Sequence, residues 1–307
     1  MKPISRKVRE ETELLMAIKE KLASYADLID RTISEYLNKS DNELDPLLES
    51  MRYSAEAGGK RIRPFLTLLI CEALGGDIHK ALPYAIAVEL VHTYSLIHDD
   101  LPAMDNDDYR RGKLTNHKVY GEARAILSGD ALLTYAFEVI ANNDRMSDSE
   151  NIKAIRILAE DSGAFGMIGG QEIDLATEQQ KTYETLVKMH RLKTGALICA
   201  AAKLGVLAAG YGDDAKVLNA AKIYGDAIGL TFQIVDDILD YTKSYVELGK
   251  SNSDERNGKT TFLTFMRPEE AFDKAVGVTA EGTRAIAPYD KTKELTELAR
   301  FLLFRNK

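Results

Sequence analysis

The chain has few cysteines, few prolines and no tryptophan, and each scarcity narrows the class of protein. Only Cys71 and Cys199 occur among 307 residues, far apart and each inside an apolar run, so neither a disulfide framework nor a cysteine metal site is expected. Seven prolines leave room for long uninterrupted helices. With 40 basic and 48 acidic side chains the net charge is −8, which argues against a nucleic-acid partner held by a broad basic face.

Long apolar runs are scarce as well. The longest, around Ala196–Ala209, contains Lys203 and is too short to span a bilayer, so no membrane-spanning segment is expected. The N-terminal residues lack the apolar centre of a signal peptide, which predicts a cytoplasmic protein. A content of 45% hydrophobic and 29% charged residues is typical of a folded globular chain.

Apolar residues recur with the period of an α-helix along nearly the whole chain. The segments with this pattern are Ala85–Leu101, Ala123–Asn142, Asn151–Gly166, Leu186–Ala209, Ala215–Tyr241 and Thr292–Asn306. Glycines mark the expected helix breaks, for example Gly58–Gly59, Gly169–Gly170 and Gly249–Gly258. We find no sustained strand-like alternation, linker or repeat. Residues 1–307 are therefore predicted to form one all-α domain.

Two aspartate clusters follow strongly apolar helical segments. The first, Asp99–Asp108, holds five aspartates in ten residues, and the second, Gln233–Asp240, places Asp236, Asp237 and Asp240 on one helix face. Like charges on an apolar helix destabilise it unless a cation neutralises them. Mg²⁺ suits such clusters because it binds a few carboxylates together with water and substrate phosphate oxygens. A solvated acidic loop could explain either cluster alone, but not two so alike.

Basic motifs lie near several of the expected helix breaks. They are Gly58-Gly59-Lys60-Arg61-Ile62-Arg63-Pro64, Arg110-Arg111-Gly112, Lys193-Thr194-Gly195 and Leu248-Gly249-Lys250. Arginine forks match phosphate oxygens in pairs, and lysines act as point charges. Each motif alone could form ordinary surface ion pairs. Together with the acidic clusters they predict a site for two diphosphates, one bound through metal and the other by cations directly.

His92 and His98 lie in the apolar segment directly before the first aspartate cluster. His92 is either an ordinary core residue or a hydrogen-bond donor to a diphosphate. His98-Asp99 also resembles the histidine–aspartate pair of metal-dependent phosphohydrolases, but no further histidine with a matching acidic partner is present to complete such a site.

In their order and spacing, several motifs resemble those of the short-chain trans-prenyl diphosphate synthases. They are GGKRIRP, HDDLPAMDNDDYRRG, GDALLTYAFE, KTGAL, GLTFQIVDDILD and LGK…NGKTTF, from about Gly58 to Phe262. The resemblance implies an all-α helical bundle around a central active-site cavity, usually in a homodimer. It also implies head-to-tail condensation of isopentenyl diphosphate with dimethylallyl or geranyl diphosphate, assisted by three Mg²⁺ ions, with Mn²⁺ as an alternative metal.

The resemblance assigns a role to individual residues of this sequence. The metal ligands would be Asp99, Asp105 and Asp236, with Asp100 and Asp240 acting behind them or through water. Isopentenyl diphosphate would be held by Lys60, Arg63, His92 and Arg111, and the allylic diphosphate by Arg110, Lys193 and Lys250. Thr194 and Gln233 would lie near the allylic cation and, with Lys193, Asp99 and Asp236, form the catalytic set.

Product length is expected to depend on Tyr94 and Ser95, five and four residues before Asp99. The spacing between Asp100 and Asp105 resembles the bacterial farnesyl and plant-type geranylgeranyl groups. An aromatic ring at Tyr94 is expected to stop the chain near C15, which favours a farnesyl diphosphate synthase (a geranyltranstransferase) most similar to the bacterial enzymes. Core packing alone is the other explanation for Tyr94. The alternative functions are a geranylgeranyl diphosphate synthase and, in another class, a non-catalytic subunit of a heteromeric synthase.

Overall fold

A computed structural model describes residues 6–176, 182–247 and 260–305 of the chain. The helices are α1 (Arg6–Leu37), α2 (Asp45–Ala55), α3 (Ile62–Ala73), α4 (Ile78–Asp99), α5 (Asn116–Tyr120), α6 (Glu122–Ala141), α7 (Asp148–Ser162), α8 (Met167–Ala176), α9 (Tyr183–His190), α10 (Ala196–Val206), α11 (Ala215–Glu247), α13 (Pro268–Ile286) and α14 (Glu294–Leu303). Short π-helical and 3₁₀ turns lie at η1 (Arg191–Gly195), η2 (Leu207–Tyr211) and η3 (Phe262–Thr264). The all-α prediction is confirmed; the strands among the described residues are β1 (Tyr109–Arg110) and β2 (Lys113–Leu114), which form a small antiparallel hairpin.

The central helix α4 begins and ends where its sequence dictates. The Asp77 carboxylate caps its first turn by accepting a hydrogen bond from the backbone of His79. Most of its side chains are buried, as the nearly continuous apolar sequence predicts. The helix stops at Asp99, and Pro102 cannot continue the helical ladder. The chain then folds back, so that the backbone N–H of Asp105 donates to the carbonyl of Asp99 at 2.9 Å.

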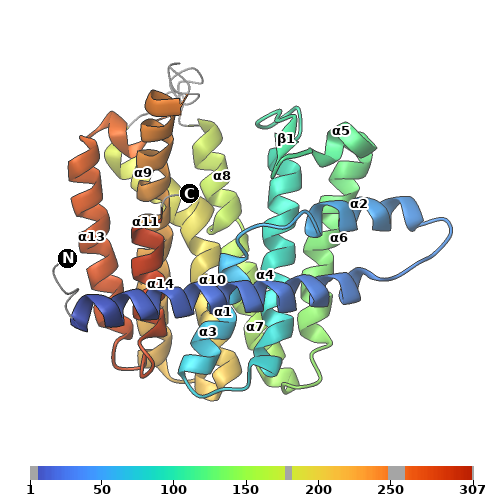
Figure 1. Cartoon of the computed structure of the whole chain (residues 1–307). Coiled ribbons are helices and arrows are strands. Elements are labelled where there is room, and N and C mark those ends of the chain that lie inside the picture. Colours follow the sequence, from blue (N-terminus) through green and yellow to red (C-terminus); the bar gives the residue numbers. More distant parts are fainter. Residues whose placement is uncertain (1–5, 177–181, 248–259, 306–307) are drawn as a thin grey trace.

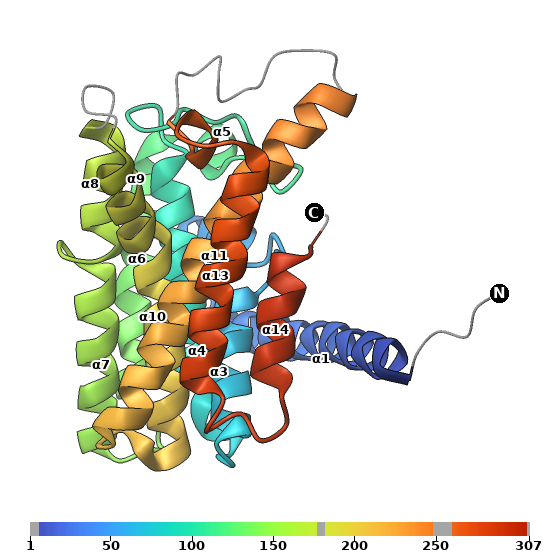
Figure 2. The same cartoon turned by 90° about the vertical axis from the view of Figure 1, so that its left-hand side faces the viewer.

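The long helices run along the bundle, whereas α1 crosses them (Figure 1). Because α4 and α11 run in the same direction, their C-terminal ends lie at the same end of the bundle as the β1–β2 hairpin (Figures 1 and 2). Helix α10 packs against both α4 and α11 and is almost entirely buried. The arrangement brings the two aspartate clusters to one end of the molecule, as a shared site for both clusters needs.

The helical stretch from α9 to η2, Tyr183–Tyr211, is long and apolar enough to cross a membrane by length and composition. In the structure 72% of its most apolar window is buried inside the bundle, as in the core helix of a globular protein. Cys71 and Cys199 are both buried and unpaired, as their apolar surroundings predict. One expected break was wrong, because Gly169 and Gly170 lie inside α8 and the chain turns instead at Gly163–Gly166.

Candidate active site

The first aspartate cluster divides its carboxylates between two surroundings. Asp99, at the last turn of α4, is partly buried, and burial raises its pKa to about 6, although Lys193 nearby acts in the opposite direction. Asp105 is exposed at the position where the loop folds back onto Asp99. Asp100 is 3% exposed and is bound by an arginine. Asp99 and Asp105 are therefore the carboxylates of this cluster that lie together at the open end of the bundle.

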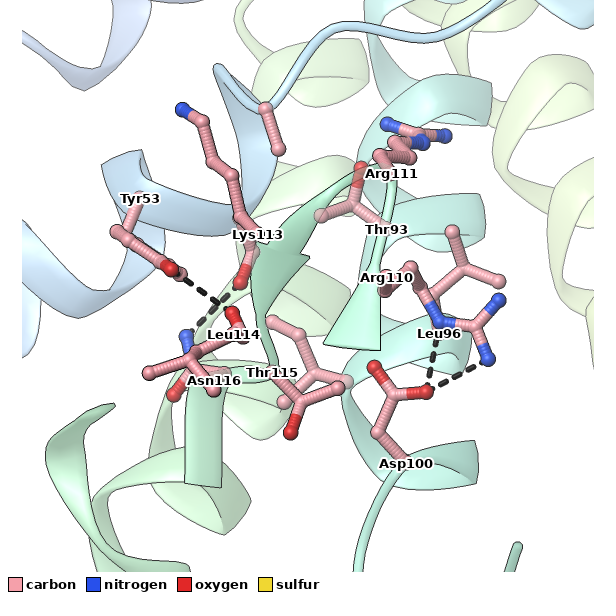
Figure 3. Close-up of a pocket in the computed structure, with 13 residues that line it drawn as sticks. Tyr53, Thr93, Leu96, Asp100, Arg110, Arg111, Lys113, Leu114, Thr115 and Asn116 are labelled. Carbon is pink, nitrogen blue, oxygen red and sulfur yellow. Dashed lines mark hydrogen bonds and ion pairs between the residues drawn. The ribbon is translucent and has the colours of Figure 1, made fainter. Parts of the chain in front are cut away.

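The consecutive residues Arg110 and Arg111 point in different directions (Figure 3). Nε and Nη2 of Arg110 each lie 2.6 Å from Oδ1 of Asp100. Burial raises the pKa of the Asp100 carboxyl, and the bond to Arg110 acts in the opposite direction. Arg111 instead donates to the carbonyl of Gly58. A small pocket lies between α2, α4 and the hairpin, and both arginines line it (Figure 3). The two neighbouring arginines are thus held in different places, Arg110 at the end of α4 and Arg111 at the glycine pair before α3.

The glycine pair before α3 makes room for Arg111. A Cβ atom on Gly59 would lie 2.7 Å from the guanidinium carbon of Arg111, and the φ angle of +130° at Gly59 also favours glycine. The GGKRIRP motif therefore brings Arg111 against the loop before α3, which carries Lys60, while Arg63 lies in the first turn of α3. Arg61, within the same motif, has a structural role: its fully buried guanidinium pairs with Asp30 at 2.7 Å and Glu89 at 2.6 Å.

Positive charge gathers around His92 on α4. Burial lowers the pKa of His92 well below its usual value, and Arg63, Arg111 and Arg110 add to this effect, so the imidazole is neutral near pH 7. Burial also lowers the pKa of Arg63 to about 10, and its buried Nε has no hydrogen-bond partner in the described part of the chain. A partly buried cation whose Nε is buried and unmatched fits a site for an anion.

The second aspartate cluster lies on α11, where each carboxylate has a different neighbour. Asp236 accepts a hydrogen bond from Arg305 at 2.6 Å. Burial raises its pKa, while Arg305 and then Lys60 act in the opposite direction. Asp237 caps η3 by accepting from the backbone N–H of Phe262 at 2.7 Å, and Asp240 is exposed.

The π-helical turn η1, between α9 and α10, carries one side chain that acts on the first cluster and one that bonds beside the second. Within it, the Lys193 ammonium pairs with Asp174 of α8 at 2.7 Å, and the same lysine influences Asp99. The Thr194 hydroxyl donates to Oε1 of Gln233 at 2.5 Å, one helical turn before Asp236. An extra residue in a helical turn redirects side chains and is frequent at functional sites. Here it places Lys193 towards the first cluster and Thr194 towards the second.

The turn η1 lies directly against α8. A Cβ atom on Gly170 would lie 2.0 Å from the backbone nitrogen of Lys193 and 2.5 Å from its Cα atom. Only glycine allows two backbones to approach this closely. This tertiary contact explains why Gly170 lies inside a helix rather than at a break.

The donor set fits Mg²⁺ shared with a substrate. Among the described residues, no group of three or more His, Cys, Asp or Glu side chains is close enough to hold a metal by itself. Asp99 and Asp236 are partly buried carboxylates, and a bound cation would favour their ionised forms. Oxygen ligands from few carboxylates, completed by phosphate oxygens, are what Mg²⁺ prefers.

Several residues at this end of the bundle belong to none of the motifs found in the sequence. Asp174 pairs with Lys193, and Arg305 pairs with Asp236. Both amide atoms of Gln171 are buried without a partner among the described residues, and His190 stacks on Phe262 with a ring-centroid distance of 5.3 Å. The i, i+3 spacing of Gln171 and Asp174 on one face of α8 is a signal that could have pointed to these two residues, and no such spacing marks Arg305 or His190. Lys250, predicted to bind the allylic diphosphate, lies outside the described residues.

The fold and the site define an all-helical synthase with paired aspartate clusters. Residues 45–287 match the model of the polyprenyl synthetase family. A geranylgeranyl diphosphate synthase of Cyanophora paradoxa is 46% identical over 89% of this chain and 93% of its own, and a farnesyl diphosphate synthase of Micrococcus luteus is 41% identical over 94% and 100%. A crystal structure of an FPP/GFPP synthase from Zymomonas mobilis is 35% identical and superimposes with a TM-score of 0.84, covering 94% of this chain and 99% of that one.

The chain therefore belongs to the polyprenyl synthetase family. It is a prenyltransferase, a trans-prenyl synthase that condenses isopentenyl diphosphate with allylic diphosphates.

The raised pKa of Asp99 predicts a pH-dependent stability of the metal-free protein. Because the folded-state pKa is about 6 and the ordinary value is about 4, the folded protein holds this proton more tightly, and stability falls as the pH rises through that window. Asp99→Asn should therefore raise the free energy of unfolding near neutral pH by about 1–2 kcal/mol, after allowance for partial exposure, and should give no gain below about pH 4.

Thermal unfolding with a chelator, recorded at both pH values, measures this difference. Asp108→Asn is the matched control, because Asp108 is exposed and pairs with Lys118 at 2.7 Å. It should show no gain at neutral pH. An Asp99→Asn protein no more stable than wild type near neutral pH would contradict the burial argument.

Proposed function

We propose that the chain is a farnesyl diphosphate synthase. The observation that supports a C15 product is Tyr94, which is 5% exposed on α4 five residues before Asp99. Its ring packs edge-to-face on His98 with a centroid distance of 5.7 Å, and its buried hydroxyl has no partner among the described residues. A fixed aromatic ring beneath the aspartates is suited to limit the length of the growing chain. Ser95 lies beside it and donates to the His92 carbonyl.

The described residues divide the reaction between them. Lys193 and Arg110 would hold the allylic diphosphate near Asp99 and Asp105. Arg63, Arg111 and neutral His92, with Lys60, would hold isopentenyl diphosphate on the α3 side. Holding two reactants in a fixed orientation lowers the barrier of their union by several kcal/mol.

The oxygen atoms of Thr194 and Gln233 bond each other one helical turn before Asp236 and would face the positive charge that develops on the allylic carbon. Asp99, Asp105 and Asp236 would hold Mg²⁺, which supplies Lewis-acid stabilisation of the leaving pyrophosphate when it is bound. Asp100 and Asp240 would act behind these ligands. In this structure Asp100 bonds Arg110, so its role is to orient that arginine.

A geranylgeranyl diphosphate synthase is the second candidate. One observation favours it: the relative from Cyanophora paradoxa, 46% identical, bears that name. Chromatography of the products made from dimethylallyl, geranyl and farnesyl diphosphate, each with isopentenyl diphosphate and Mg²⁺, separates the candidates. A C15 end product supports the proposal, and C20 formed from farnesyl diphosphate at a comparable rate contradicts it. Absence of turnover with every primer would favour a non-catalytic subunit.

Truncation of Tyr94 tests the residue itself. Tyr94→Ala should open space beneath the aspartates and shift the main product from C15 to C20 or longer. Tyr94→Phe keeps the ring and should keep the C15 product. The product distribution of each variant, measured by chromatography, decides the assignment, and an unchanged distribution in Tyr94→Ala would show that Tyr94 is only a core residue.

We further propose a single-domain chain that acts as a cytoplasmic homodimer. Large apolar side chains on α6 and α7 are exposed, including Leu127 and Ile152 at 57% each, and a partner copy would cover them. Two buried, unpaired cysteines are in keeping with a reducing compartment. Light scattering measures the oligomeric state directly.

A further inference from the structure

Arg305, beyond the end of α14, reaches back to the second aspartate cluster on α11. Its Nη2 donates to Oδ1 of Asp236 at 2.6 Å and to the carbonyl of Phe232 at 2.7 Å. The guanidinium carbon lies 3.7 Å from the centre of the Phe232 ring. The side chain is only 4% exposed, so the guanidinium is fixed by a carboxylate, a backbone carbonyl and an aromatic face at once.

The contact has a directional consequence for Asp236. Arg305 takes Oδ1, and the Asp236 side chain remains 35% exposed. A carboxylate held through one oxygen by a fixed donor presents its other oxygen in one direction. Ligating carboxylates are commonly held in this way, and loss of such a partner weakens metal binding about 10–100-fold.

We infer that Arg305 is a positioning residue for the metal site: it fixes Oδ1 of Asp236 so that Oδ2 faces the cation. The inference rests on the proposed function, because it takes Asp236 as a metal ligand. It assigns to the C-terminal end of the chain a part in binding the divalent ion.

A competing effect acts in the opposite direction, because the positive charge of Arg305 repels a metal ion nearby. The structure favours positioning over competition. The bond to the Phe232 carbonyl and the stacking on its ring do not involve Asp236, so the guanidinium would keep its place when a cation arrives. Nε and Nη1 of Arg305 are buried without partners among the described residues, which costs about 1–3 kcal/mol and indicates that the residue serves more than stability.

The sign of one change in metal affinity separates the two effects. Electron paramagnetic resonance can follow Mn²⁺ binding in the presence of inorganic pyrophosphate, without turnover. Arg305→Gln should weaken Mn²⁺ binding roughly 10-fold although it removes a repelling charge. Arg305→Lys keeps the charge but lacks the planar fork, and should weaken binding as well. Unchanged or tighter binding in Arg305→Gln would overturn the inference.

Two further variants complete the experiment. Arg267→Gln is the matched control, because Arg267 also pairs with a carboxylate, Glu270, but is 76% exposed and outside the site. It should bind Mn²⁺ as wild type does. Asp236→Asn should lose affinity more strongly than either Arg305 variant. If Asp236→Asn binds Mn²⁺ like wild type, the metal assignment of the proposed function fails, and the inference fails with it. If only the Arg305 variants behave like wild type, the inference alone fails. Circular dichroism of each variant verifies folding, and Arg305→Lys carries the test should Arg305→Gln not fold.

Discussion

Asp99→Asn should reduce kcat on the order of 10³-fold while the protein stays folded. Asp99 lies at the end of α4, beside Lys193 and beneath the loop that carries Asp105. Loss of its negative charge removes a metal ligand, and stabilisation of the leaving pyrophosphate in the transition state falls by several kcal/mol. Release of pyrophosphate from geranyl and isopentenyl diphosphate measures the effect.

The control for this variant lies in the same cluster. Asp108→Asn removes an aspartate whose side chain is 59% exposed and paired with Lys118, and its kcat should stay within about twofold of wild type. Equal losses in both variants would indicate that the net charge of the loop matters rather than one ligand. The same Asp99→Asn substitution is expected to stabilise the metal-free protein. A carboxylate that serves function at a cost in stability should show this combination: its removal stabilises the protein and lowers its activity.

Helical periodicity predicted the helices α4 and α11 that carry the aspartate clusters, but its segments did not include α3 or α8. The expected segment Ala215–Tyr241 lies within α11. The expected segment Ala123–Asn142 begins and ends one residue later than α6. Periodicity could not predict the π-helical turn η1 or the place of Gly170, because both depend on a contact between segments distant in the sequence. A glycine pair alone indicates a break, and only packing shows that it serves a close approach.

The same limit applies to the partners of the motif residues. The aspartate and basic motifs predicted which residues gather at one end of the bundle. They did not predict that Asp100 would bond Arg110 while Asp99 stays open, because the end of α4 decides which carboxylate turns inward. Arg305 and Asp236 are separated by 69 residues, and no local pattern joins them. The motifs thus predicted which residues carry the chemistry, whereas only the tertiary structure shows which side chains hold them in place.

Gly170→Ala should disrupt catalysis although Gly170 itself has no proposed contact with substrate. The added methyl group would meet the backbone nitrogen of Lys193 at 2.0 Å, and backbone cannot yield as a flexible side chain does. Helix α8 and η1 must therefore separate, and this displaces both Lys193 and Thr194. Overpacking of this kind costs about 1–3 kcal/mol of stability, and a displacement of about 1 Å at a reacting centre can reduce the rate about 100-fold. Steady-state kinetics and thermal unfolding measure the two effects.

Gly277→Ala separates the close contact from the general effect of glycine in a helix. Gly277 lies in α13, and a Cβ atom there would meet nothing within 4 Å. This variant should gain about 0.5–1 kcal/mol, because alanine is the better helix former, and should keep wild-type kcat. Full activity in Gly170→Ala would show that η1 can shift without loss of the Lys193 and Thr194 geometry. A loss of kcat larger than unfolding explains, absent from Gly277→Ala, would identify the contact between α8 and η1 as the support of the catalytic turn.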